Sequence, residues 1–231
     1  WRFTNVAPIA KASFQPFESG DAGWTVDKLE KLTFGGPGIR RIVFVNGRYS
    51  AGLSSIGDLS TGVRIESLSA ALETTPDDVH KGLARFVHYE NQVFAALNTA
   101  FFSDGAFIHV PAGVDLDGTV HVVFAVTTGK QPGISHPRNL ITVGKSARLS
   151  VVQSYVGEQG QYLTNAVTEI AAAPNAVVDH YTLQQESLDA FHTSVLEMNA
   201  GRSSVVSNQS CIFGGAIVRN DVNLVLSGEG A

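Results

Sequence analysis

The sequence has almost no cysteine and few charged residues, and both shortages narrow what the protein can be. Its single cysteine, Cys211, excludes an internal disulfide framework and any metal site built from several cysteines, and it favours a reducing compartment. Charged residues make up 16%, and 16 Lys and Arg against 21 Asp and Glu leave a net charge of −5. No block of Lys or Arg is present, which disfavours a protein that follows nucleic-acid phosphates.

Long apolar runs are missing too. The longest fall far short of the ~20 residues that a membrane-spanning helix needs. No secretion signal is recognisable in the first residues, so a cytoplasmic location is expected. Hydrophobic residues nonetheless make up 44%, accompanied by 23 glycines. That composition favours a strand-rich body with a substantial core over intrinsic disorder.

Motifs of catalytic and phosphate-binding sites are absent as well. The glycine-rich stretches 34–41 (FGGPGIRR) and 103–105 (SDG) lack the Gly-Lys-Ser/Thr of a Walker A loop, and we interpret them as turns. No Gly-x-Ser-x-Gly nucleophile elbow occurs, and no two carboxylates form a recognisable acid/base pair. The sequence therefore predicts no catalytic residue.

Cys211 and the histidines are the remaining candidates for metal ligands. Cys211 has apolar neighbours in a strand-rich stretch and is predicted to be a small core residue rather than a thiolate ligand or sulfur acceptor. His80 and His88 are eight residues apart on a predicted helix, and His180 and His192 belong to adjacent repeats and could approach one another. No carboxylate completes either set at convincing spacing. We therefore predict no metal-binding or cofactor-binding residue.

The first 103 residues predict a mixed region with a hairpin and helices. An apolar run over 42–45 meets Asn46-Gly47, the dipeptide best suited to a two-residue hairpin turn. Residues 62–103 are predicted to be helical, with Thr75 as an N-cap and Pro76 at the first helical position of one helix. Three apolar stripes mark the helices: Leu68 and Leu72; Val79, Leu83, Phe86 and Val87; and Val93, Leu97 and Phe101.

From residue 104 to 231 the pattern changes to a repeat of strands and corners. Four ten-residue segments align without gaps, beginning at residues 138, 167, 193 and 222, so they are 29, 26 and 29 residues apart. Their seventh to ninth columns are small or turn-prone, and their fourth column is always aliphatic. The segments are RNLITVGKSA, VTEIAAAPNA, TSVLEMNAGR and VNLVLSGEGA, and the fourth column is Ile141, Ile170, Leu196 and Val225.

A second strand-like segment follows each of the first three corners: RLSVVQSYV from 148, VVDHYTLQQ from 177 and SSVVSNQSC from 203. A looser early copy, IHVPAGV, occupies 108–114. A fixed period with two strands and two corners is better explained by a solenoid than by hairpins. We therefore predict a mainly β fold, with a parallel β-helix over 104–231 after the mixed region 1–103.

Such a fold does not by itself reveal a function. Right-handed β-helices include secreted polysaccharide lyases, so a carbohydrate-acting enzyme is one hypothesis. It needs carboxylates and basic residues clustered along a groove, whereas Asp and Arg are dispersed in this sequence. A plain protein-interaction solenoid is another hypothesis.

Several motifs, in this order, resemble the SufB/SufD family of iron–sulfur cluster assembly proteins. They extend along the whole sequence and include WRFTNVAPIA, RIVFVNGRYS, HPRNLITVGKSARLSVVQSYVG, YLTNAVTEI, VVDHYTLQQES and VRNDVNLVLSGEGA. The resemblance implies an N-terminal helical region followed by a right-handed parallel β-helix, which agrees with the repeat.

Within this family the chain is more similar to SufD than to SufB. Its first motif is SufD-like. Where SufB-type sequences carry a cysteine tied to sulfur transfer, this chain has Tyr155, and the Arg-x-Asn of the preceding SufB strand is replaced around 122–128 (VVFAVTT). These losses imply a subunit that does not itself build the cluster.

The resemblance implies a non-enzymatic scaffold of the SUF system. Such a subunit pairs with a SufB-type subunit through their β-helices, holds a SufC-type ATPase through a C-terminal helical region, and is associated with iron entry. The nascent cluster forms at the interface of the two β-helices. The Cys and His implicated in SufD proteins are expected to lie beyond residue 231, so no site residue and no bound cofactor are carried over.

The two ends of the sequence predict a piece of a longer protein. The chain opens on Trp1 rather than Met, and VNLVLSGEGA looks like the first strand and corner of a further turn. A solenoid that stops there leaves strand edges unpaired. We therefore expect the chain to dimerise or aggregate through its last turn.

Overall fold

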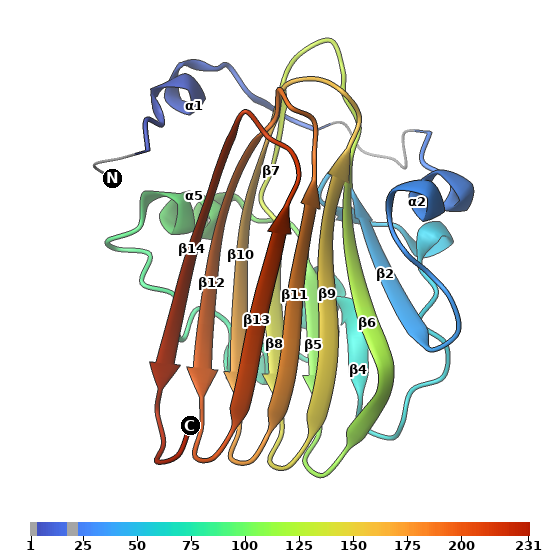
Figure 1. Ribbon diagram of the computed structural model, residues 1–231, viewed down its shortest axis with the longest axis vertical. Helices are drawn as coiled ribbons and strands as arrows, with labels where there is room; N and C mark the ends of the chain where they lie inside the picture. Colours follow the sequence, from blue (N-terminus) through green and yellow to red (C-terminus); the bar gives the residue numbers. More distant parts are fainter. Residues whose placement is uncertain (1–3, 18–22) are drawn as a thin grey trace.

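Two β-sheets that face each other form most of the molecule in the computed structural model, which describes residues 4–17 and 23–231 (Figure 1). From residue 106 onward each turn of the chain places one strand in each sheet, and equivalent strands of successive turns pair in parallel. The predicted mainly β fold with a parallel β-helix is therefore confirmed, and the solenoid has about four turns.

Sheet A has eight strands and sheet B has six among the described residues. Sheet A consists of β1 (Gln15–Pro16), β4 (Arg64–Ser67), β5 (Ala106–Val110), β7 (Gly133–Ser135), β8 (Arg138–Val143), β10 (Tyr162–Ala172), β12 (Phe191–Ala200) and β14 (Ile217–Leu226). Sheet B consists of β2 (Ile39–Val45), β3 (Arg48–Tyr49), β6 (Asp115–Val126), β9 (Arg148–Gly157), β11 (Val177–Gln185) and β13 (Val205–Ile212).

The hairpin predicted around Asn46-Gly47 is confirmed. β2 and β3 pair antiparallel, and both turn residues have positive φ, 55° and 78°, as a two-residue turn of this kind requires. β2 also pairs in parallel with β6, and β4 pairs antiparallel with β5. Strands from both sides of residue 103 thus belong to each sheet, while the domain boundary there stays a prediction.

One inward-facing column of sheet A confirms part of the repeat. Ile141 pairs with Ile170 as predicted, and the loose early copy joins them because Ile108 pairs with Ile141. The column continues, however, through Met198 and Leu224. Its members are separated by 33, 29, 28 and 26 residues, so successive turns become shorter.

The predicted register of the last two repeats is wrong for this reason. Leu196 pairs with Thr168, two residues before the expected partner, and Val225 pairs with Asn199, one residue beyond it. The second strand of the third repeat likewise begins at Val205 instead of residue 203. A one-residue slip moves a side chain to the other face of a strand, so Val225 lies outside the column and not in it.

Six short helices accompany the sheets, counted over the described residues. They are α1 (Ala7–Lys11), α2 (Val26–Leu32), the 3₁₀ turn η1 (Ala51–Leu53), α3 (Leu68–Thr74), α4 (Pro76–His80) and α5 (Val93–Phe101). The predicted short helix before Thr75 and the helix over 93–101 are confirmed. Residues 62–103 are not helical throughout, because β4 lies among them.

The helix predicted to reach residue 87 ends at His80. Ala84 has a φ of 59°, and the backbone N–H groups of Ala84 and Phe86 donate to the Glu169 carboxylate on β10, at 2.8 and 3.1 Å. Residues that satisfy their N–H groups on a strand have no need of the helical hydrogen-bond ladder. Val79 and Val87 are still buried, but from separate segments.

The same carboxylate is paired with a buried arginine. Arg138 Nη2 lies 2.5 Å from Glu169 Oε1, and both side chains are at most 1% exposed. The Arg138 guanidinium also donates to Thr99 Oγ1 on α5, at 3.1 Å. This ion pair fixes the segment 81–101 to the outer face of sheet A.

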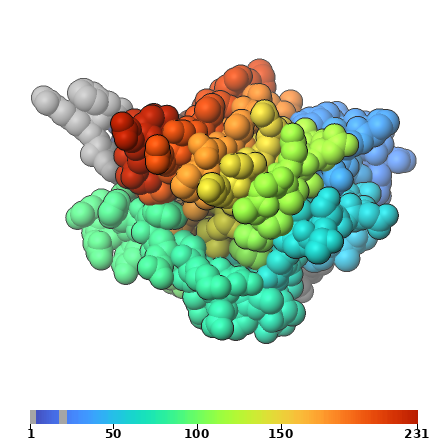
Figure 2. All heavy atoms as spheres, turned by 90° about the horizontal axis from the view of Figure 1, so that it is seen from below, coloured from blue at the N-terminus to red at the C-terminus, as the bar shows by residue number. Residues whose placement is uncertain are grey.

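Helices cover the outer faces of both sheets. α3, α4 and α5 pack on sheet A, where Figure 2 shows this segment along one side of the solenoid. α2 packs on sheet B through Leu29, beside Trp24 and Val123. The buried face of α5 contains Phe94, Ala95 and Asn98, whereas the predicted Val93 and Phe101 are each 64% exposed. No helix among the described residues is long and apolar enough to cross a membrane.

Candidate functional site

Polar side chains occupy part of the space between the two sheets, a place that is normally apolar. Below them, near the corners, the interior is a continuous apolar cluster that includes Ile108, Ile141 and Ile170. Above it, rows of side chains change along the solenoid axis. The row of stacked aromatic rings Phe44, Phe124 and Tyr155, with centroids 5.2 and 5.0 Å apart, leads to Gln184.

The first half of this polar layer is built around His180. Its Nδ1 lies 2.8 Å from Asn208 Oδ1 on β13, and its Nε2 lies 2.9 Å from Gln153 Oε1 on β9. Gln153 Nε2 donates in turn to Thr168 Oγ1 on the facing sheet, at 3.1 Å. Burial lowers the pKa of His180, opposed by the hydrogen bond to Asn208. The network therefore joins the two sheets with polar groups that are mutually satisfied.

The second half is a buried carboxylate with three donors. Glu186 lies 2.7 Å from His192 Nδ1 and accepts from Thr164 Oγ1 at 2.6 Å and from Gln184 Nε2 at 2.9 Å. Glu186 and His192 side chains are each 1% exposed. Three hydrogen bonds of this kind offset the cost of burying a carboxylate. Nothing in the sequence pattern pointed to this pair, because its members flank a turn.

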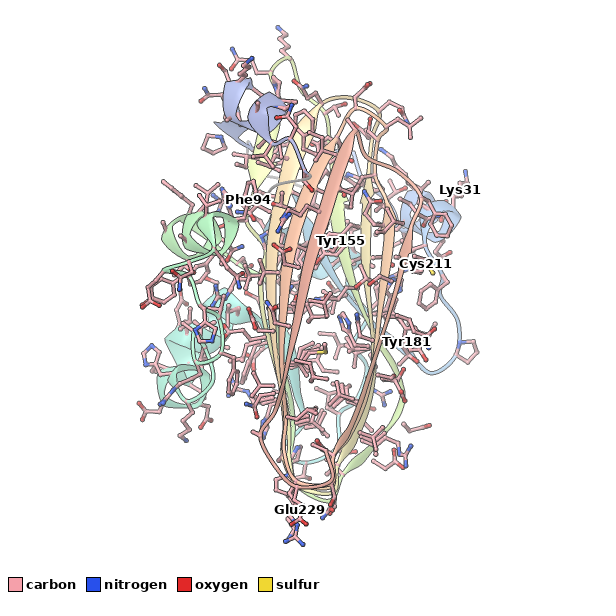
Figure 3. All side chains as sticks on the ribbon, turned by 60° about the vertical axis from the view of Figure 1, so that its left-hand side comes forward. Lys31, Phe94, Tyr155, Tyr181, Cys211 and Glu229 are labelled. Atoms are coloured by element: carbon pink, nitrogen blue, oxygen red, sulfur yellow. The ribbon has the colours of Figure 1, made fainter. Side chains whose placement is uncertain are left out.

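Tyr155 lies beside the pair. Figure 3 places it between the two sheets, and its ring meets the His192 ring edge to face, with centroids 4.7 Å apart. Burial, and then the negative charge of Glu186, raise the pKa of Tyr155 far above its usual value. The phenol therefore stays protonated and is no nucleophile.

The space left in this layer is small. A void of about 20 Å³ lies between Gln153, Tyr155 and Ser194, which is room for one water molecule and not for a substrate. The arrangement is thus able to hold protons and to bind the sheets together. Its geometry does not admit a reacting molecule.

The structure places Cys211 differently from the sequence prediction. It lies on β13 opposite Leu183, and its side chain is exposed on the outer side of sheet B (Figure 3). The apolar neighbours in sequence misled the prediction, since Ile212 and Phe213 are themselves 48% and 66% exposed. Cys211 is therefore not a core residue.

The histidine pairs are also separated. His80 ends α4 and His88 lies in the irregular segment that follows, so no helix face unites them. His180 and His192 stand in facing sheets and bond to different partners. Over residues 4–17 and 23–231, no group of three or more His, Cys, Asp or Glu side chains is arranged to hold a metal ion.

The glycine-rich stretches are turns in the structure. Gly36 and Gly38 have φ values of 140° and 77° in the loop before β2. Gly105 precedes β5, where a Cβ atom would overlap the carbonyl oxygen of Arg138. Glycine is needed there for close approach of two backbones.

The last strands form an exposed apolar edge. β13 and β14 each hydrogen-bond to one neighbour within the described residues. The apolar side chains along them are between 46% and 62% exposed, namely Val205, Ile212, Val222, Leu224, Val225 and Leu226. Both sheets are able to take a further parallel strand here, and apolar exposure of this extent marks an interaction surface.

Comparison with protein families gives two matches that divide the chain. The model described as SUF system FeS cluster assembly, SufBD core domain, matches residues 124–231, and the model described as SufBD protein N-terminal region matches residues 38–122.

Curated relatives carry related names. The iron-sulfur cluster assembly SufBD family protein slr0076 of Synechocystis sp. is 27% identical over 213 residues, which cover 88% of this chain and 46% of the relative. Protein ABCI7, chloroplastic, of Arabidopsis thaliana is 24% identical over 97% of this chain and 47% of the relative. Iron-sulfur cluster assembly protein SufB of Bacillus subtilis is 26% identical over 74% of this chain and 37% of the relative. The chain spans about half the length of the first two relatives.

Proposed function

Because the chain belongs to the SufBD family of iron–sulfur cluster assembly proteins, we propose that it is a non-catalytic scaffold subunit of a SUF assembly complex. The observation that carries the proposal is the pair of family matches, which together extend over the hairpin, the helical segment and all turns of the solenoid. The nascent cluster is the cargo of this complex, and a cytoplasmic location is part of the proposal.

The proposal assigns the chain to the SufD-type branch. Tyr155 stands at the position where SufB-type sequences carry a cysteine, and its protonated, buried phenol is unsuited to accept sulfur. Cys211 lies on the opposite side of sheet B from the polar layer. The cluster-building thiols would then come from a SufB-type partner.

Pairing with that partner is proposed to use the two strand edges β13 and β14. Their exposed apolar side chains and free backbone groups support the addition of strands, whether from this polypeptide or from another. A SufC-type ATPase and a part in iron acquisition complete the proposed role, and both rest on family membership.

The carbohydrate-acting alternative has less support. A lyase or hydrolase needs carboxylates that open onto a groove. Here Glu169 and Glu186 are buried and held by Arg138 and His192. Neither carboxylate is placed to meet a polysaccharide.

The test is co-expression of this chain, carrying an affinity tag, with the SufB-type and SufC-type subunits of the same organism. We expect the SufB-type subunit to co-purify in equal amount. The double substitution Val222→Lys with Leu224→Lys should abolish this co-purification, because it puts charge on an apolar strand edge. Leu188→Lys, at a site that is 71% exposed on a loop, is the matched control and should have no effect. Elution of the wild-type chain without either subunit would refute the proposal.

A further inference from the structure

A pocket of about 340 Å³ lies where the N-terminal segment, the β2–β3 turn, α5 and β7 meet. Its size falls in the range of small-molecule sites. It is separate from the polar layer and from the edge of β13 and β14, and shares no lining residue with either. The proposed scaffold role makes no use of it.

The walls of the pocket are largely aromatic. Phe14 and Phe17 come from the N-terminal segment, and Leu97 and Phe101 come from α5. Phe17 lies flat on β7 because Gly133 has no side chain; a Cβ atom there would overlap the Phe17 ring. Phe101 is 64% exposed although it is apolar. Walls of this kind favour a flat ring between them.

The polar groups of the pocket are a cation and hydrogen-bond donors. The Arg48 guanidinium makes no ion pair or hydrogen bond in the structure. Ser135 is only 6% exposed, yet its hydroxyl has no hydrogen-bond partner and is not sealed from solvent, so it opens onto the pocket. No Asp or Glu is among the described residues that line the pocket.

His136 adds one more donor. Asn165 Nδ2 donates to His136 Nδ1 at 3.1 Å, an orientation fixed because the same amide donates to Phe94 O and accepts from Thr193. The proton of the neutral ring therefore sits on Nε2. Burial lowers the pKa of His136 to about 4, so the ring remains neutral at pH 7.

We propose that this pocket binds a small molecule with a planar aromatic body and a single carboxylate. The rings of Phe14, Phe17 and Phe101 would enclose the body. Arg48 supplies the one positive charge, and Ser135 supplies a buried hydrogen-bond donor for the acid group. A cationic ligand is disfavoured, since no carboxylate of the described lining would meet it.

The test is an amide chemical-shift titration of the 231-residue protein with 1-naphthoate and, as its uncharged match, 1-naphthalenemethanol. We expect saturable shifts at Gly47 and Ser135 with both compounds. Arg48→Met should weaken naphthoate binding by about 5- to 10-fold and change naphthalenemethanol binding by less than about twofold, as loss of one partly exposed charge pair predicts. Phe101→Ala should weaken both compounds, because it removes a wall.

Both substituted side chains are exposed, so the variants are expected to fold, and Arg202→Met at an exposed corner is the matched control. Unchanged affinities in that control support the proposal. Shifts confined to β13 and β14, equal losses for the two compounds in Arg48→Met, or no saturable shift up to about 5 mM would overturn it.

Discussion

His121 shows how the fold sets the chemistry of a single side chain. It is fully buried on the outer face of sheet B, stacked on Phe34 with ring centroids 4.1 Å apart. Its Nδ1 lies 3.2 Å from Phe34 O, and its Nε2 lies 2.8 Å from Ser154 Oγ. A neutral ring satisfies both contacts, and burial lowers its pKa to about 4. The sequence alone gave no sign of this, because Phe34 and His121 are 87 residues apart.

Stability should therefore fall on acidification. The folded pKa of His121 lies below its ordinary value of 6.5, so the unfolded chain binds more protons between pH 6.5 and 4. Across that window His121 should lower the free energy of unfolding by on the order of 3 kcal/mol. Urea denaturation of His121→Gln and wild type at pH 7 and pH 4.5 measures it. The variant should lose less stability than wild type on acidification, and the exposed-site control His80→Gln should behave as wild type. Parallel pH profiles for wild type and His121→Gln would contradict the assignment.

At the scale of elements, a strand side chain decides where a helix ends. The apolar stripe from Val79 to Val87 is typical of a helix, yet Glu169 takes the N–H groups of Ala84 and Phe86 and the chain turns away. This contact spans more than 80 residues, so no local pattern contains it. By contrast, the Asn46-Gly47 turn is a local device, and the sequence predicted it correctly.

Register was predictable only where the strands differ in polarity between their faces. Ile141 and Ile170 stand in such a context. Near Leu196 and Val225, apolar residues occupy consecutive positions and both faces look alike, so a shift of one or two residues leaves the pattern unchanged. Cys211 was misplaced for the same reason, and the buried Glu186–His192 pair left no pattern at all.

The Arg138–Glu169 pair should anchor the helical segment. Glu169→Gln leaves a buried guanidinium without its counter-charge, which should cost about 3–5 kcal/mol of unfolding free energy. Guanidinium denaturation measures the loss, and hydrogen exchange should show earlier opening at Ala84 and Phe86. Asp78→Asn, which breaks an exposed pair with Lys81, is the control and should change little. Removing both buried charges, with Arg138→Met added, should recover part of the stability. If the double variant were less stable than Glu169→Gln, the pair would not be the anchor.

At the scale of the whole molecule, the edge of β13 and β14 governs association. The 231-residue chain should form dimers or larger species at rising concentration, because unpaired strands with exposed apolar side chains accept another chain. Light scattering over a concentration series measures this. Val222→Lys with Leu224→Lys should give a constant monomer mass, whereas Leu188→Lys should not. A wild-type mass that stays monomeric at every concentration would refute the expectation.

The sheets also differ in how far apart in the chain their neighbouring strands lie. From β8 to β14 each strand pairs with one that is 26–29 residues away, whereas β2 pairs with β6 across 80 residues. Closing the longer loop costs more chain entropy. We therefore expect the later turns of the solenoid to form first and the hairpin strand to join last. Pulse-labelled hydrogen exchange during refolding should then protect amides such as Ile170 before Val43, and the reverse order would contradict it.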